Sequence, residues 1–375
     1  MSSNGGTAIL GAGLFATEAH LPALVKLGPA APPLKAVYSR SESSAQKLAA
    51  AAATALHVAP GVYHDGDTSA NLDALLKRSD ITSVILVLPI AHQPGVIVKA
   101  LAAGKHVLSE KPVAKDVAEG AKLLATFESQ YKPKDLVWRV AENFEAEPGF
   151  QAAGKAIRDG KIGKVMFFNM SVVNYIDKKS KWYNTPWRTV PDYQGGFVLD
   201  GGVHSTAALR VTLQSPLTYL SGFASLNKDY LKPHDTVNAV LKAADGSHGM
   251  FELTFAAPTQ SRTGNTMTVT GNSGWLSVSH ATVEDASTGS QTPVIRVTIK
   301  SITEVDGKAG VEKEEVVDEP VRGVEIELKS FFAAIGGADD GLGNPAEALK
   351  DVAIIQAALN SKGQPIDLEK LISQQ

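Results

Sequence analysis

The first part of the chain alternates short apolar runs with segments of helical composition. The apolar runs have the length of buried strands, and the segments between them have the length and composition of helices. The expected strands lie at 7–10, 34–38, 83–88, 107–108 and 136–140, and the expected helices lie at 45–55, 71–77, 94–103 and 117–131. A strand–helix repeat of this kind predicts a parallel sheet with right-handed crossovers.

The pattern changes after residue 143, where β-rich segments dominate and turn sequences such as Asp245-Gly246 separate them. The expected strands lie at 165–173, 217–226, 236–243, 249–255, 265–270, 274–279 and 294–302, and the expected helices at 150–159, 203–213, 325–335 and 346–361. Strands without long helices between them indicate a mostly antiparallel sheet. We therefore predict two domains, 1–143 and 144–375, with the C-terminal helices at about 325–361 packing back on both.

A glycine-rich turn follows the first expected strand. The sequence from Gly11 to Ala16 has the pattern G-x-G-x-x-A, with Gly13, Leu14 and Phe15 inside it. The first glycine permits a tight turn, the second lets the backbone approach a pyrophosphate, and the alanine lets helix and strand pack closely. The helix start offers N–H groups to phosphates. An ordinary glycine turn can have the same sequence pattern. The position of this one, between an expected strand and an expected helix, favours a dinucleotide site.

A lysine stands just beyond the apolar run at 107–108. Ser109, Glu110, Lys111 and Pro112 follow that run directly. Ligands of open parallel sheets bind outside the carboxyl ends of the strands. We therefore expect Glu110 and Lys111 to lie where the reactive ring of a cofactor can reach.

The residues at the end of the second expected strand indicate which dinucleotide binds. Ser39 and Arg40 follow that strand, and the nearest acid is Glu42, in the first turn of the next helix. An acid at the strand end accepts a free ribose 2′-OH, whereas an arginine accommodates a 2′-phosphate. The sequence therefore predicts NADP(H) in preference to NAD(H). The alternative is that Arg40 is a solvated loop residue and Glu42 an ordinary acid at a helix start.

A second candidate cluster lies in the later part of the chain. Asp200 and His204 are four residues apart in a glycine-rich helix start, so one helix face would carry both. Histidine titrates near neutral pH and can transfer a proton. Asp200 and His204 could also share a metal ion, but no third ligand is evident nearby, and we expect no metal. The structural alternative is a helix N-cap aspartate with a surface histidine.

Two loops supply further candidates. Trp187 and Arg188 lie in an aromatic-rich stretch that suits a substrate lid, with rings to stack on a sugar and a guanidinium to hold an oxygen. Packing of these rings onto the sheet is an equal alternative. His92, which follows Pro89 in the loop after the expected strand at 83–88, is a weaker candidate for a place near the nicotinamide.

Composition narrows the class of protein. The net charge is −3, which implies no broad basic face for nucleic acid. The chain has no cysteine, so disulfides, thiolate catalysis and cysteine metal sites are excluded. We find no secretory signal and no apolar run of membrane-spanning length. A cytoplasmic location without nucleic-acid or membrane partners is the expectation.

Four motifs together resemble the Gfo/Idh/MocA family, the relatives of glucose–fructose oxidoreductase and inositol dehydrogenase. They are the glycine turn, GKHVLSEKP at 104–112, AENF at 141–144 and GGFVLDGGVH at 195–204, in the family's order over essentially the whole chain. The resemblance implies an N-terminal Rossmann domain and a C-terminal domain with a large, open, mostly antiparallel sheet. Many members have an aspartate three residues after the histidine, where this chain has Ala207, so sugar specificity is not inherited.

The resemblance also implies a function and its residues. The family's catalytic lysine, aspartate and histidine correspond to Lys111, Asp200 and His204. We expect an NADP(H)-dependent oxidoreductase that transfers a hydride between the nicotinamide and a carbonyl or secondary alcohol of a small polar, sugar-like or cyclic substrate. We expect the cofactor to contact Gly11, Gly13, Leu14, Phe15, Ser39, Arg40, Pro89, His92, Glu110, Lys111 and Asn143.

Other readings of the same motifs stay open. One is a cofactor-binding regulator without turnover, because a fold does not fix a function. Another is an epimerase or hydrolase type of enzyme that recycles a tightly bound cofactor. By analogy with the family, we expect a homodimer or homotetramer that assembles through the C-terminal sheet.

Overall fold

The computed structural model describes residues 5–260, 265–284, 289–305 and 308–374. The chain forms two compact units, one made of residues 1–143 with 324–349 and the other of residues 144–323 with 350–375. The described chain contains no helix that is long and apolar enough to cross a membrane.

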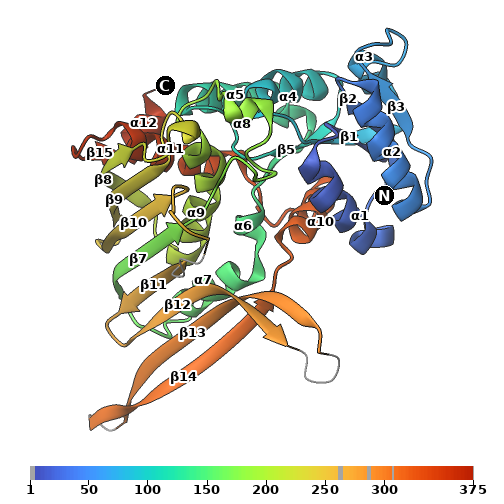
Figure 1. The fold of residues 1–375 in the computed structure, drawn as a ribbon. Helices are drawn as coiled ribbons and strands as arrows, with labels where there is room; N and C mark the ends of the chain where they lie inside the picture. Colours follow the sequence, from blue (N-terminus) through green and yellow to red (C-terminus); the bar gives the residue numbers. More distant parts are fainter. Residues whose placement is uncertain (1–4, 261–264, 285–288, 306–307, 375) are drawn as a thin grey trace. The chain divides into compact units, whose positions relative to one another are not determined.

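The first unit is a six-stranded parallel sheet with the order β3-β2-β1-β4-β5-β6 (Figure 1). Its strands are β1 (Gly6–Leu10), β2 (Leu34–Ser39), β3 (Gly61–His64), β4 (Ile81–Leu86), β5 (His106–Glu110) and β6 (Trp138–Ala141). Its helices are α1 (Leu21–Leu27), α2 (Glu42–Leu56), α3 (Leu72–Leu76), α4 (Gln93–Ala102), α5 (Val117–Gln130) and most of α10 (Gly323–Ile335). This is the strand order of a doubly wound Rossmann domain, which confirms the expected fold class.

Burial explains why these segments form this sheet. Ile9, Val37, Ile85 and Leu108 from four strands are all almost fully buried and form one cluster. Strands covered by helices on both faces are apolar throughout, as the sequence pattern requires. Phe331 of α10 joins the same cluster, so a segment from near the end of the chain completes the core of the first unit.

The second unit is built on a nine-stranded sheet with the order β14-β13-β12-β11-β7-β10-β9-β8-β15 (Figure 1). The strands are β7 (Val165–Val173), β8 (Leu217–Ser225), β9 (Thr236–Ala243), β10 (His248–Thr254), β11 (Thr266–Gly271), β12 (Gly274–Glu284), β13 (Gln291–Val305), β14 (Lys308–Pro320) and β15 (Ile366–Asp367). Among the described strand pairs of this second sheet, only β7–β10 is parallel. The expectation of a mostly antiparallel sheet is therefore confirmed.

Helices complete this unit. They are α6 (Asn143–Ala146), α7 (Pro148–Arg158), α8 (Pro186–Thr189), α9 (Phe197–Leu213), α11 (Pro345–Asn360) and α12 (Leu368–Ser373), with the start of α6 and the first turn of α11 assigned to the first unit. In β9, Val237, Ala239 and Leu241 are buried, whereas Asn238 and Val240 between them are exposed. This alternation gives the sheet one covered face and one open face.

Four sequence expectations need correction. The strand expected at 83–88 ends at Leu86. The helix expected at 203–213 begins six residues earlier, at Phe197, because the glycine pair before it supplies the N-cap: Gly196 has φ 54°. Asp200 is therefore not the N-cap residue. The strands β3, β14 and β15 are absent from the expected ones.

Candidate functional site

The glycine turn of the first unit is fixed by close backbone contacts. The Gly11 amide donates to the Tyr38 carbonyl oxygen at 2.8 Å. Gly11 has φ 114°, and a Cβ there would lie 2.1 Å from the Val87 carbonyl oxygen. Only glycine fits such a position. A Cβ on Gly13 would meet no described atom within 4 Å, so its backbone faces open space. A turn of this shape fits a dinucleotide pyrophosphate, which needs bare backbone at close range.

The helix after this turn starts with a wider π-helical turn, Ala16–His20. Insertions of this kind are frequent at functional sites. His20 closes the turn and is fully buried, and its Nε2 lies 2.6 Å from Glu110 Oε1. The Phe15 ring meets His20 edge-on, with centroids 5.3 Å apart. The turn therefore joins the glycine loop to the end of β5.

Lys111 follows Glu110 at the carboxyl end of β5. The pairing of Glu110 with Ala141 of β6 fixes its register in the sheet. The Lys111–Pro112 peptide bond is cis, and Lys111 is half-buried. The structure therefore brings Gly11, Glu110 and Lys111 to the same edge of the sheet, where ligands of such folds bind.

The end of β2 carries the residues that bear on cofactor choice. Arg40 is exposed and has no ion-pair partner among the described residues. The Ser41 side chain caps α2, and Glu42 accepts a hydrogen bond from Gln46, which holds its carboxylate along the helix. Asp65, which the sequence analysis missed, follows β3 and accepts a 2.7 Å hydrogen bond from the Tyr38 hydroxyl. Burial, and then Asp65, raise the pKa of Tyr38 above its ordinary value.

The loop after β4 contains Pro89 and His92, which begin and end a 3₁₀ turn. His92 is exposed, whereas its neighbour Gln93 is buried. Neither amide atom of Gln93 has a hydrogen-bond partner among the described residues. A buried amide without a hydrogen-bond partner is uncommon. A bound cofactor is one group that supplies such a partner.

In the second unit, Asp200 lies in the first turn of α9 and is buried. Its Oδ2 accepts a 2.7 Å hydrogen bond from Arg188 Nε, and the two side chains form an ion pair. The Arg188 guanidinium also lies over the Trp187 ring, 4.0 Å from its centroid. The structure thus joins both expected substrate residues to Asp200. Burial, with the Asp200 charge adding to it, raises the pKa of the neighbouring Tyr193 well above its ordinary value.

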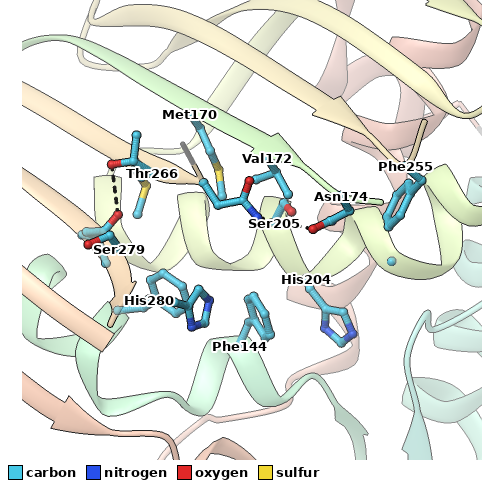
Figure 2. A pocket seen from close by; sticks show the side chains of 15 residues that line it. Phe144, Met170, Val172, Asn174, His204, Ser205, Phe255, Thr266, Ser279 and His280 are labelled. Atoms are coloured by element: carbon cyan, nitrogen blue, oxygen red, sulfur yellow. Dashed lines mark hydrogen bonds between the residues drawn. The ribbon is translucent and has the colours of Figure 1, made fainter. Parts of the chain in front are cut away.

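His204 lines a cavity of about 230 Å³ within the second unit. Its walls come from α6, α7, α9, β7, β11 and β12, together with the residue after β10. The Phe144 ring lies between His204 and His280 (Figure 2), with centroid distances of 4.8 Å and 6.1 Å. Burial lowers the pKa of His280 below its ordinary value. His204 is therefore a pocket residue, and the surface-histidine alternative is wrong.

Sequence reasoning missed several of these residues. His20 and Glu110 are 90 positions apart, and no local pattern marks their contact. His280 lies in an ordinary alternating strand, and Phe144 was noticed only as part of a motif. Asn143, which we expected at the cofactor, is the first residue of α6.

Comparison with known proteins adds to this geometry. The model of the oxidoreductase family with a NAD-binding Rossmann fold matches residues 6–133, and the GFO/IDH/MocA C-terminal domain matches residues 150–277. The chain belongs to the Gfo/Idh/MocA oxidoreductase family. The expected family is thereby confirmed, and with it a nicotinamide cofactor.

Individual relatives extend the match over both units. Dehydrogenase FPY6 of Fusarium mangiferae is 37% identical over 365 residues, which cover 95% of this chain and 96% of FPY6. The dTDP-3,4-didehydro-2,6-dideoxy-α-D-glucose 3-reductase of Saccharopolyspora spinosa is 29% identical over 64% of each chain. The crystal structure of an oxidoreductase from Thermotoga maritima superposes with a TM-score of 0.80, at 28% identity, over 97% of this chain and 98% of that one.

We predict that His20→Ala lowers both stability and dinucleotide affinity. The substitution leaves the buried Glu110 carboxyl without its partner, at a cost of about 3 kcal/mol in unfolding free energy. Urea denaturation and a fluorescence titration with the dinucleotide measure the two effects. His20→Gln keeps a hydrogen-bond donor and is expected to recover most of both. Lys26→Ala, on the exposed side of α1, is the control. Full affinity and stability in His20→Ala would contradict a positioning role.

Proposed function

We propose that this chain is an NADP(H)-dependent oxidoreductase. It moves a hydride between the nicotinamide and a carbonyl or secondary alcohol of a small polar, sugar-like or cyclic molecule. The observation that carries the proposal is the carboxyl edge of the first unit's sheet. There the open backbone at Gly13 follows β1 and Lys111 follows β5, with β4 between the two strands. Relatives named as a dehydrogenase and a sugar 3-reductase support this class of reaction.

Each proposed catalytic residue has a distinct role. The bound nicotinamide supplies the hydride. His204 donates a proton to the substrate oxygen as the carbonyl is reduced. The Lys111 ammonium stabilises the negative charge that develops on that oxygen and shares in the proton relay. Asp200, held by Arg188, orients a substrate hydroxyl or His204.

The cofactor proposal rests on Arg40. Its exposed guanidinium at the end of β2 suits a 2′-phosphate, which it can bind with paired hydrogen bonds. The carboxylate of Glu42 is held along α2 by Gln46. The Tyr38 hydroxyl occupies one oxygen of Asp65. We therefore propose NADP(H) in preference to NAD(H).

We also propose that the chain forms a homodimer or homotetramer through the open face of its nine-stranded sheet. This outer face carries exposed Phe167, Phe223, Val240, Met250 and Trp275. Val240 and Met250 are direct partners in the β9–β10 register, so the apolar side chains run across adjacent strands. Exposed apolar patches of this kind mark interaction surfaces, and a second copy of the same face forms a closed, isologous pair. A cytoplasmic location stays a prediction.

Lys111→Ala and His204→Ala are each expected to lower kcat/KM by about 10²-fold or more, because each removes a group that acts on the reacting oxygen. NADPH oxidation over a panel of aldoses, inososes, diketones and aldehydes is the measurement. NADPH affinity should change far less. Lys122→Ala and His57→Asn, at exposed positions, are matched controls. Near-normal turnover in either active-site variant would refute its assignment, and tight NADPH binding without turnover in the parent protein would favour a regulator.

Arg40→Ala is expected to weaken NADPH binding about tenfold or more and to leave NADH binding within about twofold, because only the 2′-phosphate loses a charge-assisted partner. Isothermal titration with both dinucleotides measures this difference. Lys47→Ala removes a positive charge from the exposed side of α2 and should affect neither. Equal weakening of both dinucleotides would show that Arg40 does not recognise the phosphate.

The double variant Val240→Glu/Met250→Glu is expected to convert the oligomer to a monomer of about 39.4 kDa, because paired carboxylates cannot be buried against a second apolar face. Light scattering after size exclusion measures the mass. Val311→Glu, at an exposed position of β14, is the control and should keep the parent mass. An unchanged mass in the double variant would place the interface elsewhere.

A further inference from the structure

The cavity beside His204 has a size that limits what it can hold. Its volume is about 230 Å³. An apolar cavity of about 150 Å³ in another protein accepts benzene. A cyclohexane-sized ring with a small substituent therefore fits the cavity of this chain.

The cavity wall has little charge. Among its described residues there is no aspartate, glutamate, lysine or arginine. His280 is an exposed residue of the wall, and partial burial lowers its pKa below the ordinary value, which favours the neutral ring. A carboxylate or phosphate that entered would lose water without gaining a counter-ion, which is costly. The wall favours an uncharged group.

Rings and apolar side chains make up most of the wall. Phe144 stacks on His204 with an interplanar angle of 27° and on Phe150 with centroids 5.5 Å apart. Met170 and Val172 of β7 cover another side of the cavity (Figure 2). Flat ring faces and methyl groups contact a hydrocarbon ring well and offer no hydrogen bonds to a polyol.

The polar groups of the wall are partly engaged with each other. Asn265 Oδ1 accepts a 2.7 Å hydrogen bond from the Val173 amide, and its Nδ2 donates to Asn174 Oδ1 at 3.3 Å. The Thr266 hydroxyl donates to the Val278 carbonyl oxygen. These bonds leave fewer polar partners in the wall for the hydroxyls of a sugar ring, and each hydroxyl buried without a partner costs about 1–3 kcal/mol.

We propose that this cavity binds an uncharged, cyclohexane-sized ring with few hydroxyls, attached to or containing the carbonyl that is reduced. Phe144 and His280, which both line the cavity, are then specificity-determining residues. The inference rests on the proposed function, because it takes His204 as the group that meets the substrate oxygen. It narrows the substrate class from any small polar carbonyl compound to a sparsely hydroxylated ring.

Three ketones that share one ring test the proposal. Cyclohexanone is uncharged and has no hydroxyl, 2-keto-myo-inositol is hydroxylated at every other ring carbon, and 4-oxocyclohexanecarboxylate carries a charge. Ligand-observed NMR titrations on the full chain, without dinucleotide, give the three affinities, and NADPH oxidation with each ketone gives turnover. We expect cyclohexanone to bind about tenfold or more tightly than either of the others. Equal or tighter binding of the hydroxylated or charged ring would overturn the proposal.

Variants locate the binding in this cavity. Val172→Phe fills the cavity and His280→Asp adds a carboxylate at its rim, so each should weaken cyclohexanone binding about tenfold or more. His280→Phe keeps an uncharged ring at this position and should weaken cyclohexanone binding much less than His280→Asp does. Val311→Phe is the same substitution as Val172→Phe at an exposed position of β14 and should have no effect. Parent-like binding in both Val172→Phe and His280→Asp would overturn the assignment to this cavity, and circular dichroism checks that each variant is folded.

The two readouts separate this inference from the proposed function. Cyclohexanone binding that Val172→Phe abolishes, without NADPH oxidation by any ketone, would support the ring site and refute the reductase. Rapid reduction of 2-keto-myo-inositol with no preference for cyclohexanone in binding would support the reductase and refute the ring site.

Discussion

The first unit depends on one close contact between backbones. At Gly11 the chain leaves β1 so near the Val87 carbonyl that no side chain can be present. The same residue donates to Tyr38, and the Val87 amide donates to Leu10, so the turn is bound to the ends of both neighbouring strands. The strand order reverses between β1 and β4, which opens a crevice at the carboxyl edge. Both the bare backbone at Gly13 and the position of Lys111 follow from this arrangement.

The second unit depends on a helix that packs unusually closely on its sheet. A Cβ on Gly201 would lie 2.6 Å from the Phe255 ring, and one on Gly202 would lie 2.6 Å from Leu253 and 2.9 Å from Ile355. The glycines that start α9 therefore let it lie between the sheet and α11. They also fix the direction in which Asp200 and His204 leave the helix. The glycine-rich sequence before His204 is thus required by packing as well as by any ligand.

The sequence predicted strands well where buried and exposed positions alternate. It did not predict features that depend on contacts between residues far apart in the chain. The bounds of β7 and β9 were predicted to the residue, and along β9 buried and exposed positions alternate. The short β3 was missed: all four of its residues are half-buried, so no contrast marks it. The motifs located Lys111, Asp200 and His204 as candidates, but not their partners. The His20–Glu110 and Arg188–Asp200 contacts form only when separate segments fold together.

Membership of the Gfo/Idh/MocA oxidoreductase family does not decide what the second unit binds. The glycine turn depends on backbone geometry, which tolerates little variation in sequence. The wall of the cavity beside His204 depends instead on side chains, and different side chains can occupy the same strands. A change at Val172 or His280 alters the chemistry of the wall without altering the fold. The buried Ala207, where many relatives have an aspartate, removes a further charge from the same helix. A lower charge on α9 and an apolar wall both act against polyol binding, so the same reaction would be directed to a less hydroxylated ring.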